Sequence, residues 1–219
     1  MSHTPNDSLH ILNDGHHLCW SCKEEVGEGP FCSHCVKIQP LEEVSDYFAL
    51  FGLEPHYKID PADLQKPFIE LSRKMHPDFY GQLSDSEQVI ARDNTAYLNM
   101  AYGVLKDPIK RADYLLSLKA GNTKSNPTPP QDLFDEILET GELLMNDILS
   151  ADEIKQLNRT KNDFTVRQRE LLDSLAPHFD KLLNGHNSAK TEVESRLNNV
   201  KYLRTIIRRI EQRLKQDEN

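Results

Sequence analysis

The sequence has no run of about 18 apolar residues, the length that a membrane-spanning helix requires. It also has no excess of positive charge, since its formal net charge is -9 at pH 7. A nucleic-acid-binding protein needs a basic face to neutralise phosphates, and a net acidic chain must assemble such a face locally. We therefore expect neither a membrane nor a nucleic acid among its partners.

Signatures of a stand-alone enzyme are missing as well. The chain contains no Walker loop, no dinucleotide-binding fingerprint and no Gly-x-Ser-x-Gly turn. Aromatic residues make up only 7% of the chain and charged residues 28%, and enrichment in β-branched residues is weak. This composition favours a helical protein.

The first 18 residues contain no lysine or arginine, but they include Asp7 and Asp14. A mitochondrial presequence is rich in arginine and poor in acidic residues, so this segment is not a clear presequence. We expect residues 1–15 to be a disordered lead.

Cysteine is scarce, and all four copies lie in one short segment. They form two Cys-x-x-Cys pairs, Cys19 with Cys22 and Cys32 with Cys35. This spacing is typical of tetrahedral thiolate ligation of zinc, because each pair chelates from one turn and the loop brings the two turns together. We predict a structural zinc knuckle over residues 16–40. The metal would supply folding free energy that so short a segment lacks, on the order of 10 kcal/mol in zinc-finger peptides.

Three alternatives to zinc stay open. Two disulfides are conceivable, although an intracellular chain keeps its thiols reduced. A redox-active pair would normally accompany a helix start or a βαβ pattern, and neither is present. An iron-sulfur centre uses the same four ligands. We interpret His34, inside the second pair, as a bystander because four cysteines complete the ligand set.

The strongest helix signal runs through residues 64–80. Apolar residues recur at helical spacing from Leu64 to Met75, and the pattern stops at His76-Pro77-Asp78. Proline fixes its own φ and disfavours helical geometry for the residue before it. The helix should therefore end near Met75 and leave the tripeptide on an exposed turn.

This helix is expected to form an antiparallel hairpin with a second helix at residues 85–106, so that the tripeptide lies at the tip. No serine or cysteine nucleophile is close in sequence, and no metal-ligand spacing surrounds the tip. We interpret it as a docking device. Basic residues lie on the first helix away from its apolar stripe: Lys66, Arg73 and Lys74.

Residues 46–53, the tripeptide and residues 99–108 together resemble a J-domain, the module by which co-chaperones engage DnaK-type heat-shock chaperones. Residues 111–116, Arg-Ala-Asp-Tyr-Leu-Leu, resemble in particular the HscB family of iron-sulfur co-chaperones. Some eukaryotic members carry a similar tetracysteine segment. The resemblance implies an activator of the chaperone's ATPase that is not itself an enzyme.

In this resemblance, Asp78 would accept charge-assisted hydrogen bonds from a chaperone arginine. Arg73 and Lys74 would steer the helix onto an acidic surface. His76 would brace the turn or touch the partner, and the sequence does not choose between these. The resemblance also implies the mitochondrial matrix, and the location would otherwise be cytoplasmic.

The domain organisation that we expect is all-α. A J-domain over residues 44–120 follows the zinc knuckle, residues 121–130 hold three prolines and predict a linker, and residues 131–219 form a three-helix bundle. Turns are expected around Ser150 and Gly185. Weak self-association is a further expectation.

The HscB resemblance implies that the bundle binds the scaffold protein on which iron-sulfur clusters are built. The family motif falls on Phe134, Leu138, Glu139, Glu142 and, from the last helix, Tyr202.

Two positions depart from this motif: Asp135 stands where a methionine is usual, and Gly141 stands where a helix-favouring residue is. Phe134, Leu138 and Glu142 share one helical stripe, but the same spacing would suit a bundle core.

Two other functions stay open. The chain could be a general J-protein whose bundle binds a different helical client, or a zinc-binding thiol oxidoreductase that acts through its cysteine pairs.

Overall fold

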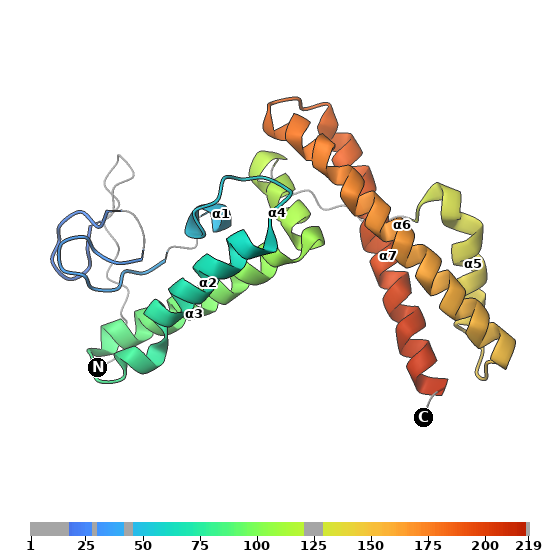
Figure 1. The fold of residues 1–219 in the computed structure, drawn as a ribbon, viewed down its shortest axis with the longest axis horizontal. Helices are drawn as coiled ribbons and strands as arrows, with labels where there is room; N and C mark the ends of the chain where they lie inside the picture. The colour runs from blue at the N-terminus through green and yellow to red at the C-terminus, as the bar shows by residue number, and fades with distance from the viewer. Residues whose placement is uncertain (1–17, 28–29, 42–45, 121–128, 218–219) are drawn as a thin grey trace, which may run out of the picture. The chain divides into compact units, whose positions relative to one another are not determined.

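The computed structural model describes residues 18–27, 30–41, 46–120 and 129–217 (Figure 1). Within these residues the regular structure is helical, which confirms the expected all-α fold. The expected lead at residues 1–15 and most of the expected linker lie outside the described residues. The helices are α1 (Tyr47–Leu50), α2 (Pro61–Met75), α3 (Asp85–Lys106), α4 (Pro108–Ala120), α5 (Phe134–Leu143), α6 (Ala151–Leu183) and α7 (Ala189–Asp217), with short 3-10 helices η1 (Pro77–Tyr80) and η2 (Gln131–Leu133).

By its contacts the chain divides into two compact units. The first contains the cysteine segment, α1, the α2–α3 hairpin and the intervening η1. The second contains residues 56–59 and everything from Asp107 onward. Helix α4 therefore groups by its contacts with the C-terminal helices, whereas the expected J-domain includes it and ends at residue 120.

The hairpin of the first unit forms where the sequence predicts it. The Asp60 carboxylate caps the start of α2 by accepting the backbone N–H of Ala62, and Pro61 occupies the first helical position. Helix α2 ends at Met75, and His76 takes an extended conformation with φ -62° and ψ 129°. The sequence-based prediction for the end of this helix is confirmed.

Aromatic packing holds the two helices of the hairpin together. The ring of Phe68 on α2 stacks on Tyr102 of α3 with centroids 4.0 Å apart. Tyr47 of α1 meets Tyr97 of α3 edge-on at 5.6 Å. Buried side chains fill the space between the helices, and they include Phe48, Leu64, Met75, Leu98 and Leu105. Burial of such side chains stabilises a domain by about 1.5–3 kcal/mol each.

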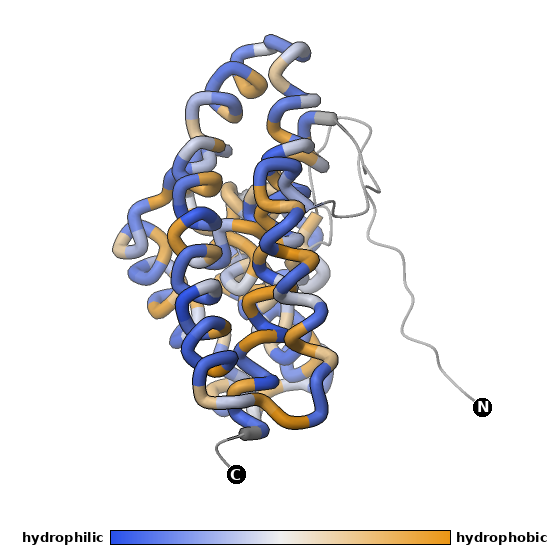
Figure 2. Tube along the Cα trace, turned by 90° about the vertical axis from the view of Figure 1, so that its right-hand side faces the viewer, coloured by the Kyte–Doolittle hydropathy of each residue, from blue (hydrophilic) through white to orange (hydrophobic). Residues whose placement is uncertain are grey.

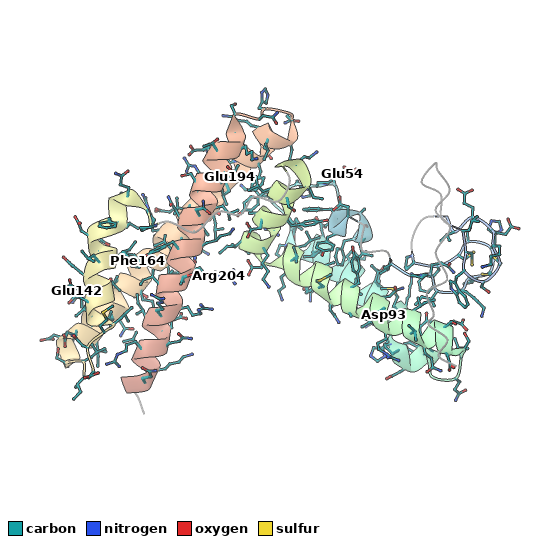
Figure 3. The ribbon with its side chains drawn as sticks, turned by 180° about the vertical axis from the view of Figure 1, so that it is seen from behind. Glu54, Asp93, Glu142, Phe164, Glu194 and Arg204 are labelled. Atoms are coloured by element: carbon teal, nitrogen blue, oxygen red, sulfur yellow. The ribbon has the colours of Figure 1, made fainter. Side chains whose placement is uncertain are left out.

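In the second unit, α6 and α7 run side by side and enclose most of the core (Figures 1 and 2). Ser150 and Glu153 form a reciprocal capping box that starts α6, as the expected turn around Ser150 requires. Phe164 is fully buried between helices (Figure 3). The bundle therefore contains the three expected helices α5, α6 and α7, and α4 packs with them.

Helix α5 is shorter than its apolar pattern suggests. It ends at Leu143, two residues after Gly141, although apolar residues continue to Ile148. Glycine in a helix interior costs about 1 kcal/mol relative to alanine, and a Cβ at Gly141 would meet no atom within 4 Å. No packing requirement thus explains this glycine, and Met145 and Ile148 stand exposed in the turn that follows.

Candidate functional site

The tripeptide at the hairpin tip is exposed and ordered by its own hydrogen bonds. His76 Nδ1 accepts the backbone N–H of Asp78 at 3.3 Å, which caps η1. The Asp78 carboxylate lies 3.5 Å from the same nitrogen. The side chain of Asp78 is 86% exposed and free to meet a partner.

Side chains behind the tip brace it. The Tyr80 hydroxyl donates to the carbonyl of Lys74 at 2.9 Å, and the Thr95 hydroxyl donates to the carbonyl of Met75 at 3.1 Å. These bonds satisfy carbonyls at the C-terminal end of α2, which has no further helical turn to do so. The turn is thereby pre-organised, with Met75 fully buried beneath it.

The three basic residues predicted on α2, Lys66, Arg73 and Lys74, are all exposed. Sequence reasoning missed one residue of this surface, Phe79, whose side chain is 70% exposed beside His76. A single aromatic after the tripeptide leaves no periodic signal that could have singled it out. The tip therefore combines positive charge, one exposed carboxylate and one exposed apolar ring.

The four cysteines come together in the first unit. Their sulfur atoms all lie within 4.8 Å of one another, and none forms a disulfide. Cys19 Sγ is 3.6 Å from Cys35 Sγ, and Cys22 Sγ is 3.7 Å from Cys32 Sγ. Four sulfurs placed tetrahedrally about 2.3 Å from a zinc ion would be about 3.8 Å apart. The geometry thus fits a tetrahedral metal site and does not fit two disulfides.

The two cysteine pairs sit in matching turns. Lys23 N–H donates to the Cys19 carbonyl and Val36 N–H donates to the Cys32 carbonyl, at 3.0 and 2.9 Å. Both donor residues adopt positive φ, 65° and 61°, which closes each turn around its pair. The same local structure therefore recurs 13 positions further along the chain, as expected for two halves of one metal knuckle.

Backbone N–H groups point at the sulfurs. Ser21 and Cys22 donate to Cys19 Sγ, each at 3.4 Å, and His34 donates to Cys32 Sγ at 3.4 Å. Burial raises the pKa of the Cys19 thiol, but the backbone donors Cys22 and Ser21, together with hydrogen bonds from the Cys22 and Cys35 thiols, outweigh burial and lower the pKa to about 6. These donors favour the thiolate form that binds metal. The side chain of His34 is exposed.

The predicted residues of α5 lie on its exposed face. Phe134 and Leu138 are 53% and 56% exposed, and Glu139 and Glu142 are exposed as well. Figure 3 marks Glu142 on this helix. The opposite face buries Ile137 and Thr140. The alternative that Phe134 and Leu138 belong to the bundle core is therefore wrong.

Tyr202 lies on α7 and is less exposed than the predicted residues of α5. Its ring is half-buried and packs against the core cluster that contains Ile137 and Phe164. Asp135 is exposed on α5, so the chain presents a carboxylate where the family motif has an apolar side chain. The exposed face of α5 is thus an apolar pair surrounded by acidic groups.

Three known proteins whose sequences resemble this chain share the name HscB. No family model matches the chain. It is 32% identical over 170 residues to the iron-sulfur cluster co-chaperone protein HscB of Mus musculus. The matched region covers 74% of this chain and 70% of that protein. It is 31% identical over 163 residues to an iron-sulfur cluster co-chaperone protein HscB homolog of Arabidopsis thaliana. That matched region covers 74% of this chain and 63% of the relative's length.

Solved structures agree with these relatives. The crystal structure of human co-chaperone protein HscB superposes with a TM-score of 0.74 and 26% identity, over 92% of this chain and 98% of that one. The chaperone HscB from Vibrio cholerae superposes with a TM-score of 0.64 and 28% identity, over 79% of this chain and 99% of that one. In the described part of the chain, no helix is long and apolar enough to span a bilayer.

Proposed function

The chain belongs to the HscB family of iron-sulfur cluster co-chaperones, and we propose that it stimulates ATP hydrolysis by a DnaK-type chaperone while delivering the cluster scaffold protein to it. In this proposal the chain performs no chemistry of its own. One surface holds the client and the other triggers the nucleotide turnover that makes the chaperone clamp it. The exposed and internally braced turn His76-Pro77-Asp78 is the observation that carries the proposal.

At the tip, Asp78 accepts charge-assisted hydrogen bonds from a cationic group of the chaperone, because its carboxylate is 86% exposed. Pro77 removes a soft torsion, which limits the entropy lost on docking. The exposed cations of α2, Lys66, Arg73 and Lys74, steer the encounter with an acidic surface. His76 holds the turn through its bond to the Asp78 N–H.

In the second unit, the scaffold binds the exposed face of α5. Phe134 and Leu138 supply apolar anchors, and Glu139 and Glu142 supply an acidic rim. Tyr202 contributes the part of its ring that stays exposed. Asp135 adds a further carboxylate, which favours a scaffold surface with more positive charge and less apolar area at this point.

The four cysteines hold a structural metal, and zinc fits their number, element and spacing. The metal supplies folding free energy to the knuckle when bound. Family membership also supports a mitochondrial matrix location, which organelle fractionation would test.

The test uses the full chain with a purified DnaK-type chaperone and a purified cluster scaffold. ATP hydrolysis is followed in single turnover at increasing concentrations of the chain, with and without scaffold. We expect the hydrolysis rate to rise with the chain and to rise further with both proteins. Stimulation without scaffold binding would indicate a general J-protein with another client, and an unchanged rate at saturating chain would overturn the proposal.

A further inference from the structure

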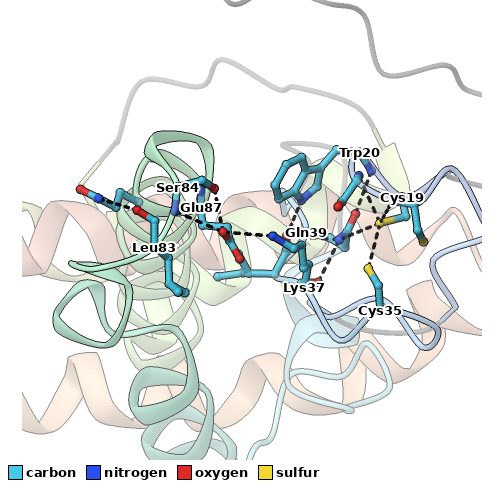
Figure 4. A network of polar contacts seen from close by, with 12 residues as sticks. Cys19, Trp20, Cys35, Lys37, Gln39, Leu83, Ser84 and Glu87 are labelled. Carbon is cyan, nitrogen blue, oxygen red and sulfur yellow. Dashed lines mark hydrogen bonds and ion pairs between the residues drawn. The ribbon is translucent and has the colours of Figure 1, made fainter.

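The segment that leaves the cysteine knuckle, residues 37–41, is fastened to the start of α3, close to the tip of the hairpin. Lys37 forms an ion pair with Glu87 at 3.2 Å, and Glu87 also accepts the hydroxyl proton of Ser84 at 2.7 Å (Figure 4). Glu87 is buried, and a carboxylate is seldom buried unless it has partners such as these. The knuckle and the hairpin therefore meet at a built contact.

Two buried amide side chains form the centre of this contact. Gln39 is 4% exposed and Asn94 is 1% exposed. The Asn94 amide is fixed in one orientation, because Nδ2 donates to the Gln39 carbonyl at 2.8 Å and Oδ1 accepts the N–H of Leu41 at 2.8 Å. The Asn94 side chain thus bonds one carbonyl and one N–H of residues 37–41, as the backbone of a neighbouring β-strand would, although Asn94 itself lies in a helix.

Each of these amides also touches one of the two functional features. The Gln39 Nε2 group donates to Cys19 Sγ at 3.3 Å, and its Oε1 accepts the N–H of Trp20 at 3.3 Å (Figure 4). Asn94 Nδ2 lies 3.8 Å from the sulfur of Met75. Met75 is fully buried and directly precedes His76. A continuous line of polar contacts thereby joins a metal-ligating sulfur to the residue beneath the tip.

We propose that Asn94 is a positioning residue that couples metal loading of the knuckle to the order of the His76-Pro77-Asp78 turn. With metal bound, the thiolate of Cys19 holds Gln39 in place, and the Gln39 carbonyl and the Leu41 N–H satisfy the buried Asn94 amide. Without metal, the knuckle loses its main source of folding free energy. Asn94 then loses its partners, and a buried amide without partners must move toward water, which disturbs the packing under Met75.

The coupling is reciprocal by thermodynamic linkage. If metal binding favours the ordered tip by some factor, then ordering of the tip raises the affinity for metal by the same factor. This reciprocity distinguishes coupling from a purely local brace. It also needs no chaperone, so the proposal stands or falls separately from the function proposed above.

The test compares the zinc-loaded full chain with the same chain after chelation under reducing conditions, by hydrogen exchange. The Leu41 N–H reports the contact with Asn94, and the Phe79 N–H, which donates to the His76 carbonyl at 3.1 Å, reports the tip. We expect removal of zinc to speed exchange at both amides, by about tenfold at the tip, since the loss of one net hydrogen bond changes a local opening equilibrium by that order. An unchanged rate at Phe79 would overturn the proposal.

The variant Asn94→Asp keeps an acceptor for the Leu41 N–H but replaces the donor to the Gln39 carbonyl with a second oxygen. We expect fast exchange at Phe79 even with zinc bound, and a loss of zinc affinity by the same factor. The matched control is Gln88→Ala, which removes another α3 amide that donates to a carbonyl, that of Leu83, and hydrogen-bonds neither Gln39 nor Leu41. A variant whose tip still responds to zinc as the wild type does would contradict the role of Asn94.

A second variant keeps the test decisive if Asn94→Asp fails to fold. Gln39→Leu removes the donor to Cys19 Sγ and leaves the Gln39 main-chain carbonyl available to Asn94. We expect zinc affinity to fall and the exchange difference between loaded and stripped protein at Phe79 to shrink. Full retention of that difference would show that the contact between Gln39 and Cys19 carries no coupling.

Discussion

Asp107 and Arg204, 97 residues apart in the sequence, are joined by two hydrogen bonds between a carboxylate and a guanidinium, at 2.8 and 3.2 Å. The same carboxylate caps α4 by accepting the N–H groups of Ile109 and Lys110, at 2.9 and 3.2 Å. One side chain therefore both starts α4 and ties it to α7. This pair explains why α4 belongs by its contacts to the second unit.

We expect Asp107→Ala to lower the free energy of unfolding by about 1–2 kcal/mol, because it removes a helix cap of about 1 kcal/mol and a partly exposed ion pair of about 0–1 kcal/mol. Asp107→Asn keeps the cap and should cost less. Urea unfolding followed by circular dichroism measures both. Equal losses for the two variants would show that the cap contributes nothing.

The contribution of Asp107 should depend on pH. Burial raises the pKa of this carboxyl, but hydrogen bonds from Arg204 and from the backbone of Lys110 and Ile109 outweigh burial, and the pKa falls below its usual value. A lowered folded-state pKa means that the stabilisation is complete above the unfolded value of about 3.9 and disappears as pH falls through the folded value. The difference between wild type and Asp107→Ala should therefore be constant from neutral pH to about 5 and vanish in stronger acid.

Asp78→Asn should abolish stimulation of the chaperone's ATPase, because the amide keeps the shape of the side chain but loses the charge that a cationic partner requires. Since Asp78 is 86% exposed, the variant should fold normally. Single-turnover hydrolysis measures the effect, and scaffold binding should survive. Asp93→Asn, another exposed aspartate of the hairpin, is the control (Figure 3). Normal stimulation by Asp78→Asn would remove the assigned role.

Leu138→Ala should weaken binding of the cluster scaffold by roughly tenfold, the order expected when an apolar anchor of an interface is truncated. Calorimetry with purified scaffold measures the loss. Leu118→Ala provides a matched control, because Leu118 is also a leucine on a helix of the second unit and is 43% exposed, against 56% for Leu138. A similar affinity for both variants would mean that α5 does not bind the scaffold through this residue.

Replacement of all four cysteines by serine should remove the bound metal and unfold residues 18–41, while the helix content stays nearly unchanged. Elemental analysis of the purified wild type gives the identity of the metal, and visible absorption separates an iron-sulfur centre from zinc. The same variant tests the oxidoreductase alternative. Thiol-exchange activity that is present in the wild type and lost in the variant would favour that alternative.

Much of the fold could be predicted from the sequence, because it depends on local signals. The start of α2 follows from Asp60 and Pro61, and its end follows from Pro77. The spacing of Phe134 and Leu138 places them on one stripe of α5, but only the structure shows that this stripe is exposed. The cysteine spacing likewise predicted that the four sulfur atoms come together, since each pair closes within one turn. Caps, prolines and cysteine pairs each determine the conformation of residues only a few positions away in the sequence.

The features that the sequence could not reveal depend on polar contacts between distant residues. Asn94 lies on α3 among ordinary helix-forming residues, and nothing nearby indicates that its partners are Gln39 and Leu41. Arg204 is equally inconspicuous among the other arginines of α7, yet it fixes α4. A single hydrogen-bonding side chain leaves no periodic pattern, so its partner is known only once the backbone has been placed.

Tyr57 is another residue whose partners lie far away in the sequence. It lies between α1 and α2 in the sequence, but its ring stacks on Phe179 of α6 with centroids 5.0 Å apart, and the Arg111 guanidinium lies 5.5 Å above it. Burial raises the pKa of the Tyr57 phenol to about 12, although the charge of Arg111 opposes this. The phenol therefore stays neutral in the folded protein at a pH where an unfolded tyrosine ionises, near 10.

A raised folded-state pKa means that the stabilisation is complete below the unfolded value near 10 and is lost as pH rises toward the folded value of about 12. Wild type should therefore lose stability across this alkaline range, and Tyr57→Phe, which keeps the ring stack, should lose less. Urea unfolding at pH values on both sides of 10 measures this, and the difference in phenolate absorbance between the two proteins reports the ionisation of Tyr57 itself. Ionisation of Tyr57 at the ordinary pH for tyrosine would contradict the burial of its phenol against Phe179 and Arg111.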